Sequence, residues 1–173
     1  MRIVHGQELI STLRLTAETV STRLWLAAHY VGEPSSIRLI LGTRWLRERS
    51  VSVRLLIDST HLVGIESATL ALFRDRGEVR VLPGLHAKLY ICDSTCLLTS
   101  ANLTETAFGR RYEIGAVFEG SLATAVVEVF EQWWAIGTAL DVAGVTLGES
   151  DRRATGNTLP QLWTMPTDPD KCS

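Results

Sequence analysis

Apolar residues follow two patterns along the chain, one typical of strands and one typical of helices. Residues 23–31 and 51–58 are almost continuously apolar over a strand length, which indicates strands buried on both faces. Residues 7–20 and 65–75 instead carry apolar side chains at helical spacing, which predicts helices with one buried face. The segment 37–49 also fits a helix, although the glycine within it lowers its helical propensity.

The second half of the chain contains shorter apolar segments. We predict strands over 78–83, 85–92, 96–102 and 109–120, and a helix that begins at 121 and ends at Gly137. Strands and helices alternate first, and several strands then follow one another closely. This order predicts an α/β fold in which helices sandwich a mixed β-sheet. We expect one domain over residues 1–142 and an irregular C-terminal tail over 143–173, which is rich in Gly, Thr, Asp and Pro.

Length and composition indicate a single globular domain. The chain has 173 residues, of which 46% are apolar and 21% charged, enough for a sizeable core. The formal net charge of −2 disfavours nucleic-acid binding by bulk charge but leaves a local basic patch open. Apolar runs are shorter than the ~18 residues of a membrane span, and the N-terminus does not resemble a secretory signal, so we expect no membrane association. Three cysteines make no disulfide framework, which favours a reducing, cytoplasmic location.

Residues 85–113 carry the candidate chemistry. Because alternate residues of a strand face the same side, His86 and Lys88 should project together, and Ser100 and Asn102 have the same offset in the next strand. A hairpin between these strands would gather an imidazole, an ammonium, a hydroxyl and an amide. An imidazole can act as a nucleophile or general acid near neutral pH. The ammonium supplies positive charge, and the hydroxyl and the amide supply hydrogen-bond donors, for phosphate oxygens. Lys88 is one of only two lysines among 17 basic residues, which favours a specific role.

Charged residues after this hairpin complete the candidate site. Glu113, on the next predicted strand, could hydrogen-bond an imidazole nitrogen and support the charged ring. Arg110 and Arg111 lie between Asn102 and Glu113 and are candidates for contact with a phosphate backbone. The arginines over 44–49 are explained at least as well by a solvated charged face.

Other polar residues nearby have a simpler structural interpretation. Asp93 begins an Asp-Ser-Thr turn, and we expect it to be structural. Cys92 and Cys96 together with His86 fit no standard zinc module, so we expect buried cysteines and no metal. His29, near the end of an apolar strand, either lies close to the site or is simply packed in the fold.

Taken together, these residues resemble the active-site motif of the phospholipase D superfamily. Residues 86–93 match its H-x-K pattern followed after four residues by Asp, and Glu113 matches its downstream glutamate. Residues 99–102 match its G-S-x-N element, with Thr99 in place of the glycine and an interval one residue shorter than usual. The resemblance covers about residues 7–140 and is to the small, single-motif, nuclease-like members, of which the phrase SANLT is typical.

The resemblance implies phosphodiester hydrolysis without a metal or cofactor. In this family one histidine attacks phosphorus and becomes a phosphohistidine, and a second protonates the leaving oxygen and then activates water. The two histidines come from two copies of the motif. Of the four histidines here, only His86 is followed two places later by lysine. The resemblance therefore implies a homodimer with one composite site on or near its two-fold axis.

DNA is the expected substrate, which would make the protein a DNA endonuclease. A single motif copy is typical of the nuclease branch, arginines flank the site, and the chain lacks an amphipathic membrane-seeking segment. Two alternatives stay open. The same site could hydrolyse or transfer phosphatidyl or other small phosphodiesters. The chain could also be a degenerate domain that binds DNA or partner proteins within a larger defence or restriction complex.

Overall fold

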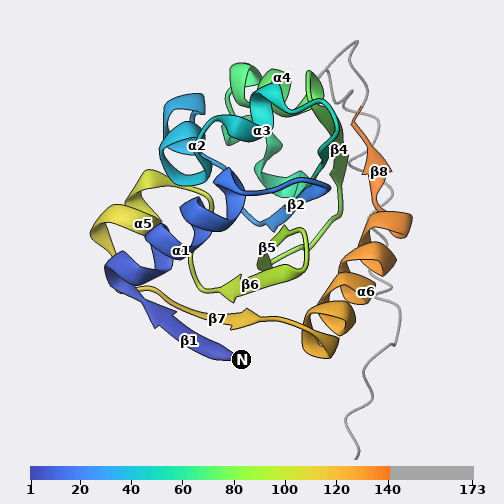
Figure 1. Cartoon of the computed structure of the whole chain (residues 1–173). Coiled ribbons are helices and arrows are strands. Elements are labelled where there is room, and N and C mark those ends of the chain that lie inside the picture. The colour runs from blue at the N-terminus through green and yellow to red at the C-terminus, as the bar shows by residue number, and fades with distance from the viewer. Residues whose placement is uncertain (141–173) are drawn as a thin grey trace, which may run out of the picture. The chain divides into compact units, whose positions relative to one another are not determined.

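The computed structural model describes residues 1–140, which form one eight-stranded sheet with helices on both faces (Figure 1). The strands are β1 (Arg2–His5), β2 (Arg23–Ala28), β3 (Ser52–Ile57), β4 (Gly77–Val81), β5 (Lys88–Cys92), β6 (Thr95–Thr99), β7 (Ile114–Phe118) and β8 (Thr138–Ala139). The α-helices are α1 (Gly6–Glu18), α2 (Pro34–Leu41), α3 (Arg44–Arg47), α4 (Ser67–Arg74), α5 (Glu105–Arg110) and α6 (Ser121–Ile136), and η1 (Ser59–Gly64) is a 3-10 helix.

The sheet is mixed, with the strand order β1-β7-β6-β5-β2-β3-β4-β8. β2, β3 and β4 run parallel, and every other pair of neighbours is antiparallel. Helices join the parallel strands, since α2 and α3 connect β2 to β3, and η1 and α4 connect β3 to β4. β5 and β6 form the expected hairpin. This hairpin places the predicted site segment next to β2, in the middle of the sheet.

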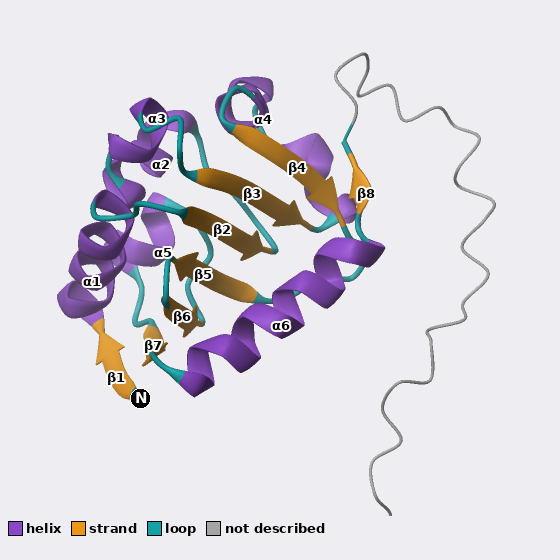
Figure 2. Cartoon of the chain, turned by 45° about the vertical axis from the view of Figure 1, so that its right-hand side comes forward, coloured by secondary structure: helices purple, strands orange, loops and turns teal. Residues whose placement is uncertain are grey.

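Helices cover both faces of the sheet (Figure 2), and a separate hydrophobic core lies on each face. On one face, α1 to α5 pack around a cluster that includes Leu13, Ile37 and Phe73. On the other face α6 packs over a cluster that includes Trp25 and Phe130, whose rings stack with centroids 5.5 Å apart. Helices thus sandwich a mixed sheet, and the predicted α/β architecture is confirmed.

The predicted strands are too long around the candidate site. Those expected over 85–92, 96–102 and 109–120 span only Lys88–Cys92, Thr95–Thr99 and Ile114–Phe118. Part of the third segment is helix α5, which Thr104 caps by accepting a hydrogen bond from the Ala107 N–H at 3.2 Å. Most of the candidate site residues therefore lie in loops next to strand ends, whereas Lys88 begins β5 and Arg110 ends α5.

The single helix expected over 37–49 is two helices, because Gly42 interrupts it. Gly42 has a φ of 71°, and a side chain there would collide with the Glu18 carboxylate. That carboxylate accepts a hydrogen bond from the Thr43 N–H at 2.8 Å, which fixes the break between α2 and α3.

The predicted domain boundary at 142 and the predicted tail over 143–173 lie outside the described residues. Across residues 1–140, none of the helices combines the length and apolar character needed to cross a membrane.

Candidate active site

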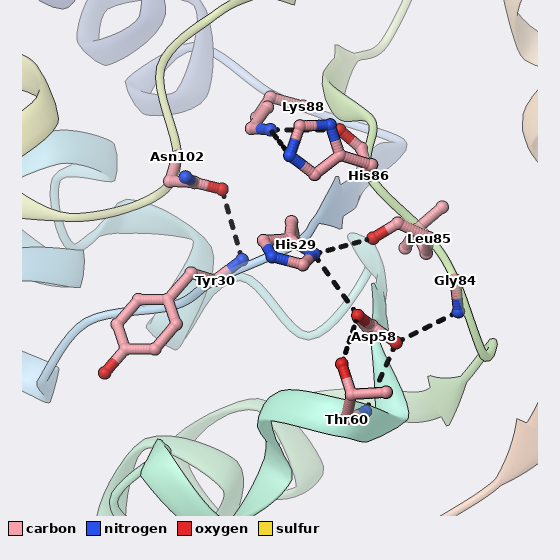
Figure 3. Close-up of polar contacts among 9 residues, drawn as sticks. All are labelled: His29, Tyr30, Asp58, Thr60, Gly84, Leu85, His86, Lys88 and Asn102. Atoms are coloured by element: carbon pink, nitrogen blue, oxygen red, sulfur yellow. Dashed lines mark hydrogen bonds and ion pairs between the residues drawn. The ribbon is translucent and has the colours of Figure 1, made fainter.

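His86 and Lys88 approach each other at the start of β5. His86 is exposed and lies in the loop before the strand, and Lys88 is the first residue of the strand. The Lys88 Nζ lies 3.2 Å from His86 Nε2 and donates to the His86 carbonyl oxygen at 3.0 Å (Figure 3). Because an ammonium has hydrogens but no lone pair, Nε2 must be the acceptor of this contact. The lone pair of the His86 ring therefore lies at Nε2, the nitrogen that faces Lys88.

Lys88 places a positive charge where little water reaches it. The residue is 8% exposed, and this burial lowers the pKa of the ammonium below its usual 10.5. The negative charge of Glu113 acts in the opposite direction and raises the Lys88 pKa, without cancelling the effect of burial. An anionic ligand, such as a phosphate oxygen, would stabilise the charged form in the same way.

Ser100 and Glu113 are brought together by the pairing of β6 with β7, because one follows β6 and the other precedes β7. The Ser100 hydroxyl donates to Glu113 Oε2 and accepts from the Ile114 N–H at 3.2 Å. Glu113 was expected to bond an imidazole nitrogen. Among the described hydrogen bonds its carboxylate instead binds Ser100, and it acts on Lys88 through its charge.

Thr99 occupies the position of the glycine in the G-S-x-N element that residues 99–102 resemble. Its side chain stabilises the local turn. Its Oγ1 donates to the Ile114 carbonyl oxygen at 2.7 Å and accepts from the Ala101 N–H at 3.1 Å. The hydroxyl therefore ties the segment that carries Ser100 to the start of β7.

Asn102 and the two candidate arginines line one pocket of about 590 Å³. Asn102 Oδ1 accepts a hydrogen bond from the Tyr30 N–H at 3.1 Å, which joins the loop after β6 to the end of β2. Arg110 is the last residue of α5 and Arg111 follows it, so neither lies in a strand as predicted; both are exposed. The same pocket is lined by His29, by the hydroxyl residues Ser36, Thr104 and Thr106, and by the carboxylates of Glu33 and Glu105.

His29 is a residue of this site that the motif does not contain. Its ring lies edge-on to that of His86, with centroids 4.7 Å apart. Its Nδ1 lies 3.0 Å from the Leu85 carbonyl oxygen and 3.2 Å from Asp58 Oδ2. The only signal for His29 in the sequence is its place near the end of a buried strand, and no spacing pattern points to Asp58.

Asp93 and the two described cysteines lie away from the site. Asp93, at the other end of β5 from His86, accepts hydrogen bonds from the backbone N–H groups of residues 21–23 at 2.8 to 2.9 Å. Cys92 and Cys96 belong to the cores on opposite faces of the sheet. Burial raises the pKa of Cys92 to about 12 and that of Cys96 to about 11, so both remain protonated thiols at neutral pH.

The converging groups are suited to an anion with a reactive centre. The Lys88 ammonium and the Asn102 amide carry hydrogen-bond donors, and the Ser100 hydroxyl donates to Glu113. The exposed His86 residue has its ring lone pair directed at Lys88. Residues 1–140 hold no cluster of three or more His, Cys, Asp or Glu side chains arranged to bind a metal ion.

Comparison with known proteins gives one family and a set of related folds. A family model described as the PLD-like domain of cardiolipin synthase matches residues 14–134. NucT from Helicobacter pylori has a similar structure (TM-score 0.70) at 14% sequence identity, over 80% of this chain and 98% of NucT. Nuc from Salmonella typhimurium, described as a phospholipase D family member, superimposes with a TM-score of 0.64 at 18% identity, over 80% of this chain and 97% of Nuc. No curated protein sequence matches the chain.

A third solved structure also has a similar fold. TrmBL2, an archaeal chromatin protein whose structure is described as showing a novel mode of DNA binding, has a TM-score of 0.58 at 16% identity. The match covers 80% of this chain and 54% of TrmBL2. At such identities these structures show the shared fold, whereas the family model spans α1 to α6 and contains every motif residue from His86 to Glu113. The motif, the fold and the family model agree, and the chain belongs to the phospholipase D superfamily.

Proposed function

We propose that this protein is a metal-independent phosphodiesterase that cleaves DNA through a phosphohistidine formed on His86. Membership of the phospholipase D superfamily supports phosphodiester hydrolase or transferase chemistry in general. The observation that carries the specific proposal is the exposed His86 ring, whose Nε2 lone pair lies 3.2 Å from the buried Lys88 ammonium. Attack on a phosphodiester needs such a nucleophile beside donors, because negative charge grows on the non-bridging oxygens.

The proposed reaction has two steps. Lys88 turns its hydrogen bond from His86 Nε2 to a phosphate oxygen, and the freed Nε2 lone pair attacks phosphorus. A nitrogen–phosphorus bond forms, and the bond to the leaving oxygen breaks as that oxygen takes a proton from a second imidazole. The second imidazole then accepts a proton from water, whose oxygen displaces His86 from phosphorus. Lys88 and the Asn102 amide donate to the non-bridging oxygens in both steps, and the Ser100 hydroxyl joins them when its hydrogen turns from Glu113 to the phosphate. Glu113 orients the Ser100 hydroxyl and supports the charge of Lys88.

We propose that a second copy of the chain supplies the second imidazole, its own His86, in a symmetric homodimer. An exposed apolar surface next to the site supports this. Leu98 lies opposite Ala116 and Ala116 opposite Ile3, so these residues share one face of β6, β7 and β1. Leu98 is 43% exposed, Ile3 52% and Ile114 57%. A surface of this kind, beside Ser100 and Glu113, favours burial against a partner.

We propose DNA as the substrate because two arginines line the pocket that adjoins the site at His29 and Asn102. Arg110 and Arg111 could pair there with phosphates next to the one that is cleaved. The net charge of −2 requires that any DNA affinity come from such a local group. The DNA-binding description of the structurally similar TrmBL2 supports the same substrate class.

The deciding experiment measures hydrolysis of plasmid DNA, of bis-p-nitrophenyl phosphate and of phosphatidylcholine vesicles, each in excess EDTA, by the wild type and His86→Ala. We expect plasmid nicking that survives EDTA and disappears in the variant, with circular dichroism showing that the variant is folded. Loss of activity in EDTA would contradict the phosphohistidine route. Headgroup release without nicking would identify a phosphatidyl substrate. A folded protein that binds DNA but cleaves nothing would be a binding domain of a larger complex.

DNA affinity tests the arginines separately from catalysis. The double variant Arg110→Ala/Arg111→Ala should bind duplex DNA more weakly, and the slope of log Kd against log salt concentration should fall by about 2, roughly 0.9 for each phosphate that an arginine no longer neutralises. Arg44→Ala/Arg47→Ala removes two other exposed arginines and is the matched control. Equal slopes for both double variants would argue against a DNA contact at Arg110 and Arg111. The measurement is fluorescence anisotropy across a salt series.

A further inference from the structure

His86 lies outside the ladders of the sheet, so its position depends on the contacts of a loop. β4 ends at Val81 and β5 begins at Lys88, and Gly84 within the loop has a φ of 78°. Two side chains from neighbouring strand ends bind the backbone just before His86. Asp58, which follows β3, accepts from the Gly84 N–H at 3.1 Å, and His29, which follows β2, binds the Leu85 carbonyl oxygen at 3.0 Å.

The tautomer of His29 follows from these contacts. Its Nδ1 lies within hydrogen-bond distance of the Leu85 carbonyl oxygen and of Asp58 Oδ2, and both are acceptors. Nδ1 therefore carries the hydrogen and donates it. The orientation of the ring is fixed by the same bonds, and its edge meets the ring of His86 at a centroid distance of 4.7 Å (Figure 3).

The Asp58 carboxylate is a charged hydrogen-bond acceptor. It is 2% exposed, and burial acts to raise its pKa. Hydrogen bonds from the Thr60 hydroxyl at 2.6 Å, from the Thr60 N–H at 3.2 Å and from Gly84 outweigh that effect, together with the charge of His29. The pKa of Asp58 consequently lies below its usual 3.8, and the carboxylate is ionised at neutral pH.

We infer that His29 and Asp58 are a positioning pair for His86, a role that rests on the proposed function of His86 as nucleophile. Asp58 binds Gly84 directly and orients His29. His29 binds the Leu85 carbonyl and packs against the His86 ring in a T-shaped contact. The two contacts fix the backbone on the N-terminal side of His86, while Lys88 binds its carbonyl on the other side. These contacts matter because misplacement of a reacting atom by about 1 Å can lower a reaction rate about 100-fold.

The experiment compares His29→Ala, His29→Asn and Asp58→Asn on bis-p-nitrophenyl phosphate in EDTA. An asparagine amide places a hydrogen-bond donor near the position of the histidine Nδ1, so His29→Asn keeps the bond to Leu85 without a titratable ring. We expect His29→Ala and Asp58→Asn to lower kcat about 10- to 100-fold with little change in KM. His29→Asn should recover most of that loss and keep the shape of the wild-type pH profile. Ser59→Ala, next to Asp58 but outside this network, should behave as wild type.

The opposite outcomes have distinct meanings. If His29→Asn is as slow as His29→Ala and one limb of the pH profile disappears, His29 transfers a proton and the positioning role is wrong. If neither His29 variant changes kcat, His29 only packs in the fold.

A second measurement does not need activity. Nuclear magnetic resonance of the imidazole nitrogens and of the Gly84 amide should show that His29→Ala shifts the His86 signals, and that Asp58→Asn speeds exchange of the Gly84 amide hydrogen. Unchanged signals would overturn the positioning role whether or not the wild type hydrolyses any phosphodiester. A wild type without activity would contradict the proposed function alone.

Discussion

At the scale of single residues, the site is built around a cation that the fold shields from water. Lys88 is 8% exposed, and the charge that offsets its desolvation comes from Glu113 on another strand end. Burial lowers the pKa of an ammonium, and a neighbouring negative charge raises it. Glu113 therefore acts on the pKa of Lys88 in the same direction as a bound phosphate would, and the pKa of Lys88 depends on Glu113.

This dependence predicts the pH behaviour of Glu113→Gln. Glu113 raises the pKa of Lys88, so its replacement by a neutral amide lowers that pKa further. If Lys88 must be charged to bind phosphate oxygens, activity is lost as pH rises through its pKa. The alkaline limb of the rate profile should accordingly move to lower pH in Glu113→Gln. Glu119→Gln, just beyond the other end of β7, removes an exposed carboxylate and is the control. An unmoved alkaline limb in Glu113→Gln would show that Lys88 does not set it.

Residue spacing predicts part of this arrangement. The expected contact of His86 with Lys88 forms, but through the loop before β5, since His86 lies outside the strand whose alternation was expected to pair them. The expected β5–β6 hairpin also forms, and Ser100 and Asn102 follow its second strand. The partner of Glu113 could not be predicted, because the choice between an imidazole and the Ser100 hydroxyl depends on distances set by the whole sheet. The contact of His29 with Asp58 could not be predicted for the same reason, because it joins the ends of two different strands.

At the scale of elements, the order of strands and helices is predictable and their ends are not. Apolar runs reveal where the chain is buried, and the alternation of strands with helices led correctly to a mixed sheet. Where each helix or strand begins and ends depends on single contacts, which the pattern of apolar residues does not reveal. Thr104 starts α5, whose last two residues fall at the beginning of a segment expected to be strand, and Gly42 divides one predicted helix into two. The edge strand β1 was missed because its four residues carry too little pattern.

Asp93 joins two such elements, the β5–β6 turn and the start of β2, and this predicts a stability that depends on pH. Its pKa lies well below the usual 3.8, because hydrogen bonds from residues 21–23 outweigh the effect of burial. A depressed pKa stabilises the fold above the unfolded value and loses that effect as pH falls. Asp93→Asn, which tolerates the φ of 52°, should lower the free energy of unfolding by about 2 kcal/mol at neutral pH.

Urea denaturation across a pH series measures this difference. The gap between wild type and Asp93→Asn should shrink below about pH 4, because the wild-type carboxyl then begins to lose its advantage over the unfolded state. Asp75→Asn, an exposed aspartate that ends α4, is the control and should cost less than about 0.5 kcal/mol. A gap that stays constant down to acid pH would mean that the charge of Asp93 does not stabilise the turn.

At the scale of the whole described molecule, the two faces of the sheet are covered unequally. α1 to α5 bury one face, whereas α6 covers the other face over Trp25 and Phe130 and leaves Ile3, Leu98 and Ile114 exposed. Those exposed residues adjoin Ser100 and Glu113. In the proposed homodimer, a second copy packed there would bury the apolar surface and bring a second His86 near the first, so the proposed oligomer and the proposed chemistry would depend on the same surface.

A charge on this surface tests that link. Leu98→Glu and Ile3→Glu should dissociate the dimer, because a carboxylate is costly to bury in an apolar interface. In analytical ultracentrifugation the wild type should sediment with twice the 19.1 kDa chain mass and the variants with the single mass, and nicking activity should fall with the dimer fraction. Leu15→Glu places the same charge on the exposed side of α1, where Leu15 is 67% exposed, and should leave the dimer intact. A fully active wild-type monomer would remove the need for a partner's histidine. Variants that remain dimeric and active would move the interface to another surface, such as the outer side of α6, where Leu122 is 50% exposed.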